Sequence, residues 1–122
     1  MRRGARCGSG AVYACAAVDV SQQHGYVHAG AASAIADSAG GYAALTLLPE
    51  DTEVLTVEYK LNLLAPALGD HIEAVGTVLK PGRTLTVCRL DVFGVREGRS
   101  KLIAAGQQTL IRVVGAVRGG GR

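Results

Sequence analysis

The sequence has little of what marks several common protein classes. It has no tryptophan, one phenylalanine and no basic stripe interleaved with aromatic residues, so its net charge of +3 does not favour nucleic-acid binding. It has no apolar run of about 18 residues, which argues against a membrane-spanning helix. With 122 residues, of which 48% are hydrophobic and 19% charged, the chain is long enough for one globular domain with a single core.

Several reactive-site patterns are also missing. The cysteines are Cys7, Cys15 and Cys88, an odd number with no C-x-x-C spacing, so they indicate free thiols in a reducing compartment and no zinc site. His24 and His28 have no third ligand nearby and make a poor metal site. The nucleophile motif G-x-S-x-G is absent, which gives a serine hydrolase no support.

The two ends of the chain carry little periodic pattern. Residues 1–10 are basic and glycine-rich, and we expect a flexible segment there. Arginines ahead of an apolar run could suggest a signal peptide, but Asp19 interrupts the run and no convincing cleavage site follows, so we expect a cytoplasmic protein. Residues 115–122 are expected to form a flexible tail, which leaves residues 11–114 as a single domain.

Hydrophobic periodicity between the two ends predicts one long helix and about five strands. The helix begins near Gly30 and ends before Pro49; it is apolar almost all round and is expected to be buried. Strands are predicted over residues 11–20, 53–64, 71–79, 84–95 and 101–114. One antiparallel sheet curled around one apolar helix is the economical α+β arrangement.

The strand over residues 53–64 alternates in sequence, and the alternation predicts two faces. One face carries Val54, Thr56, Glu58, Lys60 and Asn62, and the other carries Leu55, Val57, Tyr59, Leu61 and Leu63. A strand of this length left at an open edge would promote aggregation, so we expect it to pair with its copy across a two-fold axis. The sequence therefore predicts a homodimer, with a dimer of dimers as the alternative.

Asp37 is the one charged residue between Gly30 and Leu47. A carboxylate is costly to bury in an apolar helix unless it is paired, hydrogen-bonded or protonated, and such groups are common at functional sites. Asp37 could instead face solvent or a polar seam between subunits. From its position alone, both interpretations stay open.

Three stretches resemble a known family. They are HGYVHAGAASAIADSAGGYAAL (residues 24–45), LTVEYKLNLLAPALGD (55–70) and LKPGRTLTVCRLDVF (79–93). Together they resemble the hotdog-fold acyl-CoA thioesterases of the phenylacetate-pathway (PaaI-like) type, whose signature is His-Gly-Gly followed by Asp. Ala29 replaces the first glycine of the signature, a position used through its backbone N–H. The resemblance implies a hotdog fold, a dimer seam at the strand over residues 53–64, and an active site shared between subunits.

Thioester hydrolysis requires a polarised carbonyl and an activated water or an attacking carboxylate. The N–H of Ala29, with that of Gly30, lies at the amino end of the helix, where unsatisfied N–H groups and the helix dipole favour an oxyanion. Asp37 would act as general base or as nucleophile. Eight residues separate Ala29 from Asp37, about 12 Å along one helix, so one carbonyl contacts both only if the two helices of a dimer lie antiparallel.

The remaining site residues follow mostly from the resemblance. Gln22 would lie beside the thioester, or it is a solvated amide. His28 would orient the loop, or it is a structural histidine. Thr56 would hold the attacking water, or it is an ordinary strand threonine. Ser33 shares the helix face of Asp37, and Tyr42 would line the acyl pocket. The turn residues Lys80, Gly82, Arg83 and Thr84 would contact coenzyme A, although a basic turn is often simply solvated.

The resemblance implies an aryl or medium-chain acyl-CoA as the substrate, with coenzyme A as part of the substrate and no metal or other cofactor. Two alternatives remain at this stage. One is a hotdog dehydratase or hydratase, and the other is an acyl-CoA-binding protein on the same fold without catalytic activity.

Overall fold

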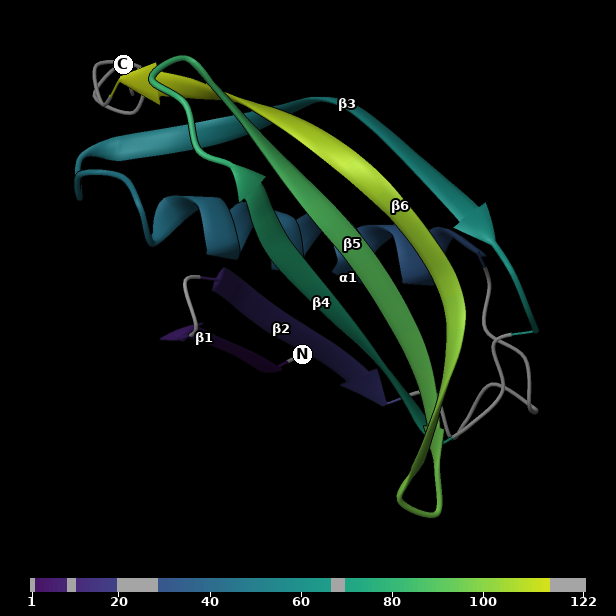
Figure 1. Cartoon of the computed structure of the whole chain (residues 1–122). Helices are drawn as coiled ribbons and strands as arrows, with labels where there is room; N and C mark the ends of the chain where they lie inside the picture. Colours follow the sequence, from purple (N-terminus) through teal and green to yellow (C-terminus); the bar gives the residue numbers. More distant parts are fainter. Residues whose placement is uncertain (1, 9–10, 20–28, 67–69, 115–122) are drawn as a thin grey trace, which may run out of the picture.

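The computed structural model describes residues 2–8, 11–19, 29–66 and 70–114, and they form one antiparallel sheet and one helix (Figure 1). The elements in chain order are β1 (Arg2–Gly8), β2 (Ala11–Asp19), α1 (Ala29–Leu45), β3 (Thr52–Leu63), β4 (His71–Lys80), β5 (Leu85–Arg96) and β6 (Arg99–Val114). The strand order in the sheet is β1-β2-β4-β5-β6-β3. The predicted α+β hotdog arrangement, a curved sheet around a long helix, is confirmed.

The tight turn between β5 and β6 follows from local sequence. Arg96 pairs with Arg99 across a two-residue connection, and both connecting residues have positive φ, 52° at Glu97 and 77° at Gly98. Two left-handed residues are typical of the type I′ turn, whose twist matches that of the flanking strands. The predicted turn at this position is therefore confirmed, and it sets the register of two long neighbouring strands.

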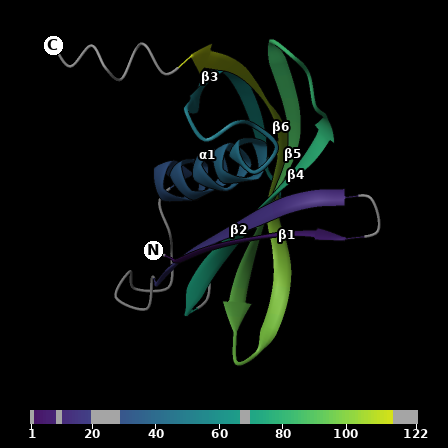
Figure 2. The same ribbon diagram turned by 90° about the vertical axis from the view of Figure 1, so that its left-hand side faces the viewer.

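The helix packs closely on the sheet because its inner face carries small residues. Figure 2 shows α1 on one side of the sheet, and its inner face contributes Ala32, Ile35, Ala36 and Ala39 to the core. The backbone itself reaches the sheet, since a Cβ added at Gly76 of β4 would lie 2.5 Å from the amide nitrogen of Gly40. The rest of this core cluster is Ala16, Ile72, Ala74, Leu90, Val92, Ile103 and Ala104.

The expectation that α1 is buried all round is wrong. Gly30 and Ala34 are exposed, and Ser33 and Asp37 are only half-buried. A single sheet covers one face of a helix, so within one chain the opposite face stays open. No helix among the described residues is long and apolar enough to cross a membrane.

The amino-terminal segment differs from the sequence-based expectation of a flexible arm outside the domain. Arg2–Gly8 form β1, which pairs antiparallel with β2 from Arg2 opposite Ala17 to Gly8 opposite Ala11. Backbone hydrogen bonds hold this strand, and they need no apolar pattern in the sequence. The sheet therefore has six strands rather than about five. The predicted tail over residues 115–122 lies outside the described residues.

A β-bulge in β3 overturns the predicted two faces of this strand. The pairing with β6 shifts between Thr56 and Glu58, which leaves Val57 as the extra residue. Thr56 pairs with Leu110 and Tyr59 with Gln108, two residues that are both buried toward α1. After the bulge, the helix-facing residues are therefore Tyr59, Leu61 and Leu63, and they share this face with Val54 and Thr56. A bulge of this kind leaves the alternation of the sequence intact while it reverses the faces.

Candidate active site

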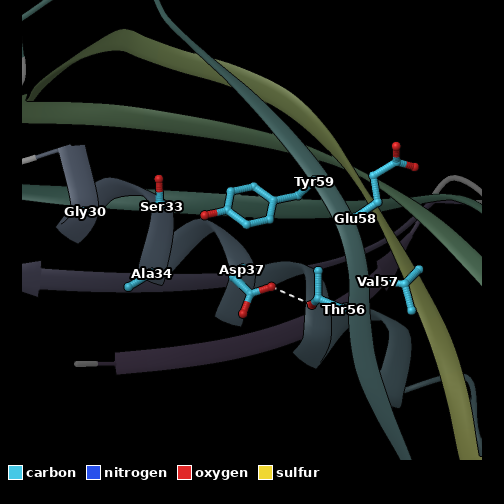
Figure 3. Close-up of a pocket in the computed structure, with 8 residues that line it drawn as sticks. All are labelled: Gly30, Ser33, Ala34, Asp37, Thr56, Val57, Glu58 and Tyr59. Atoms are coloured by element: carbon cyan, nitrogen blue, oxygen red, sulfur yellow. Dashed lines mark hydrogen bonds between the residues drawn. The ribbon is translucent and has the colours of Figure 1, made fainter.

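A pocket of about 650 Å³ lies between the open face of α1 and strand β3 (Figure 3). Its helix wall consists of Gly30, Ser33, Ala34 and Asp37, whose spacing of three or four residues places them on one face. Its strand wall consists of Thr56, Val57, Glu58 and Tyr59, the residues around the bulge. Bulges are frequent next to active sites, where they redirect side chains.

The carboxylate of Asp37 is held by hydrogen bonds from two strands. Thr56 Oγ1 of β3 donates to Asp37 Oδ1 at 2.6 Å (Figure 3), and Gln108 Nε2 of β6 donates to the same oxygen at 2.5 Å. Gln108 Nε2 also lies 3.1 Å from Thr56 Oγ1 and 3.2 Å from the backbone oxygen of Asp37. Both of these hydrogen bonds end on Oδ1, and no residue in the described part of the chain donates to Oδ2. One oxygen is thus fixed, and the other is available for chemistry.

Thr56 has a more defined place than the sequence suggested. Its single hydroxyl proton is directed to Asp37, so in this arrangement Thr56 could contact a water only by accepting a hydrogen bond from it. The hydroxyl oxygen also lies within reach of the Gln108 amide. Thr56 therefore orients the carboxylate directly.

Gln108 is the site residue that the sequence analysis missed. It is 1% exposed and lies between Tyr59 of β3 and Cys88 of β5 in the register of the sheet. Its sequence neighbour Gln107 has the same side chain and is exposed. The signal that could have found it is its position two residues before Leu110, on the core face of β6, where a polar residue is unusual.

The structure brings some of the other predicted residues to the pocket. Ala29 is the first residue of α1, at the expected amino end, and the neighbouring Gly30 lines the pocket with Ser33. Tyr42 lies five residues beyond Asp37 on α1 and is not a lining residue. Gln22 and His28 lie outside the described residues.

The predicted coenzyme A turn is not part of this pocket within one chain. Lys80 ends β4, and the residues that follow connect it to β5; Lys80, Arg83 and Thr84 are exposed. Gly82 packs against the backbone oxygen of Leu85, where a Cβ would overlap it. The backbone oxygen of Thr84 accepts a hydrogen bond from Arg112 N, which ties the turn to β6.

In the part of the chain that the structure describes, few groups other than Asp37 could bind a metal ion or act as a nucleophile. Among the residues that the structure describes, no three His, Cys, Asp or Glu side chains gather as a metal site. Cys88 is buried beneath α1, and burial raises the pKa of its thiol to about 11. Its Sγ lies 3.6 Å from the backbone oxygen of Gly40, consistent with a packing role.

Solved structures with a similar fold include two that are described as thioesterases and one that was solved with CoA. A thioesterase family protein from Silicibacter pomeroyi is 41% identical, with a TM-score of 0.77 over 93% of this chain and 85% of its own. Thioesterase HI1161 from Haemophilus influenzae is 25% identical, with a TM-score of 0.72 over 93% and 79%. The BH2602 protein from Bacillus halodurans, solved with CoA, is 22% identical, and at a TM-score of 0.68 over 72% and 60% it shows the likeness of fold.

Sequence comparison gives the family. A Halobacterium salinarum protein described as a candidate esterase, VNG_1336C, is 37% identical over 70 residues. The match covers 56% of this chain and 46% of that protein, so the chain matches about half of its relative's length. The family profile described as "Thioesterase superfamily" matches residues 24–100, which include α1, Asp37 and the strands from β3 to β5. The chain belongs to the thioesterase superfamily.

Proposed function

We propose that this protein is an acyl-CoA thioesterase of the phenylacetate-pathway (PaaI-like) type, which hydrolyses an aryl or medium-chain acyl-CoA to the free acid and CoA. The observation that carries the proposal is the Asp37 carboxylate, which lines a pocket with one oxygen held by Thr56 and Gln108. Family membership supports thioester hydrolysis, and the His-Ala-Gly and Asp motif supports the subtype. Free cysteines and a CoA substrate both suit a cytoplasmic location.

In the proposed reaction, Asp37 acts as general base. It takes a proton from water while the water oxygen attacks the thioester carbonyl carbon, and the oxyanion that forms accepts a hydrogen bond from the Ala29 N–H. The C–S bond then breaks, and the CoA thiolate leaves with the proton that Asp37 holds. The alternative is direct attack by the carboxylate on the carbonyl carbon, which breaks the C–S bond, expels the CoA thiolate and forms an acyl anhydride that water hydrolyses afterwards.

The edge position of β3 supports a dimer with shared sites. Within the described sheet, β3 pairs on one side only, with β6, and it exposes Leu55, Val57, Tyr59 and Leu63. Pairing with a second β3 would cover this edge and bring the helix of a partner near the pocket. The Ala29 amide of one subunit and Asp37 of the other would then act on one carbonyl.

Replacement of Ala29 by proline tests this sharing. Proline is accepted at the first helical position but has no N–H, so we expect Ala29→Pro to lower kcat by about 10²–10³-fold in a folded protein. Co-expression with an Asp37→Asn chain should restore about a quarter of wild-type activity, because half of the dimers are mixed and each mixed dimer has one intact shared site. A mixture as inactive as its components would place both groups in one subunit.

The remaining proposed contacts concern the substrate. Gln22 and His28 are proposed at the thioester, Ser33 beside Asp37, Tyr42 at the acyl group, and the turn with Lys80, Gly82, Arg83 and Thr84 at coenzyme A. The exposure of Lys80, Arg83 and Thr84 leaves them available to phosphates. In a dimer, the turn of one subunit would serve the pocket of the other.

Thiol release from a panel of acyl-CoAs tests the function. We expect the wild-type protein to release CoA from aryl or medium-chain acyl-CoA substrates with saturation kinetics. A thiol reagent that reacts with free CoA measures the release. Saturable binding with no thiol release would favour the binding-protein alternative. Reversible hydration of an enoyl-CoA without thiol release would favour a hydratase. Either result would overturn the proposal.

A further inference from the structure

Gln108 occupies a place where an apolar side chain would pack more simply. It is 1% exposed on the core face of β6, and its Oε1 is buried without a hydrogen-bond partner in the described part of the chain. An unsatisfied buried acceptor costs stability. The chain nevertheless provides room for it, since a Cβ on Gly40 would overlap Oε1 of Gln108.

The orientation of the Gln108 amide is determined by its neighbours. Three oxygen atoms surround Nε2: Oδ1 of Asp37, the backbone oxygen of Asp37, and Oγ1 of Thr56. The first two are acceptors, and the Thr56 hydroxyl gives its own proton to Asp37, so it can only accept from Gln108. The nitrogen must therefore face the carboxylate of Asp37, and the unpartnered oxygen must face Gly40, which is also on α1.

The contacts of Gln108 link the two elements that form the pocket. Its N–H groups reach the side chain and the main chain of Asp37 on α1 as well as Thr56 on β3. Both donors to the carboxylate meet at Oδ1. Rotation of the carboxylate would break both hydrogen bonds, so the direction of Oδ2 is fixed as well.

We propose that Gln108 is a positioning residue for the hydrolytic reaction: with Thr56 it locks Oδ1 of Asp37, so that Oδ2 is presented to the reacting water. The inference rests on the proposed thioesterase function and on Asp37 as its carboxylate. Gln108 is 1% exposed and is not a lining residue of the pocket. It acts through Asp37, by fixing the geometry of the carboxylate.

Gln108→Met tests the proposal, because methionine has a similar length and no N–H. We expect kcat to fall by about 10–100-fold, with little change in KM. This is the range typical of outer-shell groups that orient the side chains bound to a catalytic metal ion.

Gln107→Met is the matched control. It makes the same substitution one residue earlier on β6, at an exposed position on the opposite face of the strand, and it should leave kcat and KM as in the wild type. Gln108→Leu provides a second apolar replacement should the methionine variant fail to fold, as judged by circular dichroism.

The outcomes separate this inference from the function on which it rests. A wild type that releases no thiol would overturn both. An active wild type with a folded Gln108→Met or Gln108→Leu variant of unchanged kcat would overturn the positioning role alone. A loss confined to KM would also overturn it, because a residue that orients the carboxylate does not bind the substrate.

Discussion

Asp37→Asn is expected to reduce thiol release from acyl-CoA by about 10²–10⁴-fold, the usual contribution of a general base. Asparagine has the shape of aspartate, and its side-chain oxygen can still accept the hydrogen bonds from Thr56 and Gln108 that reach Oδ1. The substitution therefore replaces Oδ2 alone by an amide nitrogen, which cannot take a proton from water. The fold should be preserved and the chemistry lost.

The measurement is steady-state kcat with a substrate that the wild type hydrolyses. Asp51→Asn is the matched control, since Asp51 is exposed just before β3 and does not line the pocket. It should retain wild-type turnover. A folded Asp37→Asn protein with wild-type kcat would show that another group activates the water, and the proposed mechanism would be wrong.

Gly76→Ala is expected to have the largest effect on stability. The added Cβ would lie 2.5 Å from the nitrogen of Gly40 and 2.6 Å from the carbonyl carbon of Ala39, so it meets helix backbone rather than a flexible side chain. Either α1 or β4 must move, and overpacking of this kind costs about 1–3 kcal/mol. That is a large share of the roughly 5–15 kcal/mol by which domains are usually stable.

Urea unfolding, monitored by circular dichroism, should show this cost as a lower urea concentration at the midpoint of unfolding. Gly41→Ala is the control with the opposite sign, because nothing lies within 4 Å of a Cβ at this helical position. Alanine there should raise the free energy of unfolding by about 0.5–1 kcal/mol through helix propensity. Equal stability of Gly76→Ala and the wild type would contradict the close helix–sheet contact.

The sequence predicted the elements well because their signals are local. The alternation in β3, the glycine turn at Gly98 and the small residues of α1 each determine nearby backbone geometry. β1 was missed because its pairing with β2 depends on backbone hydrogen bonds rather than on an apolar pattern. The faces of β3 were wrong because a bulge at Val57 is a property of the pairing with β6, which the sequence of one strand does not contain.

The site was predictable only in part for a similar reason. Asp37 is conspicuous as a single charge among small apolar residues, and the family resemblance pointed to Thr56. Gln108 lies 71 positions from Asp37 in the chain, and only the sheet order places β6 beside β3 and beneath the helix. No local spacing connects the two residues, so the resemblance to short motifs could not reveal the contact.

The contact between Gly76 and the backbone of α1 also limits where an acyl chain can lie. With the helix backbone against β4 and alanines filling the inner face, the space between helix and sheet cannot serve as a hydrocarbon tunnel. In the proposed reaction, the acyl group would therefore extend along the outer face of α1, past Ser33 and Ala34, where the side chains are short. Selectivity for acyl length would then depend on whatever covers this outer face rather than on the core of the subunit.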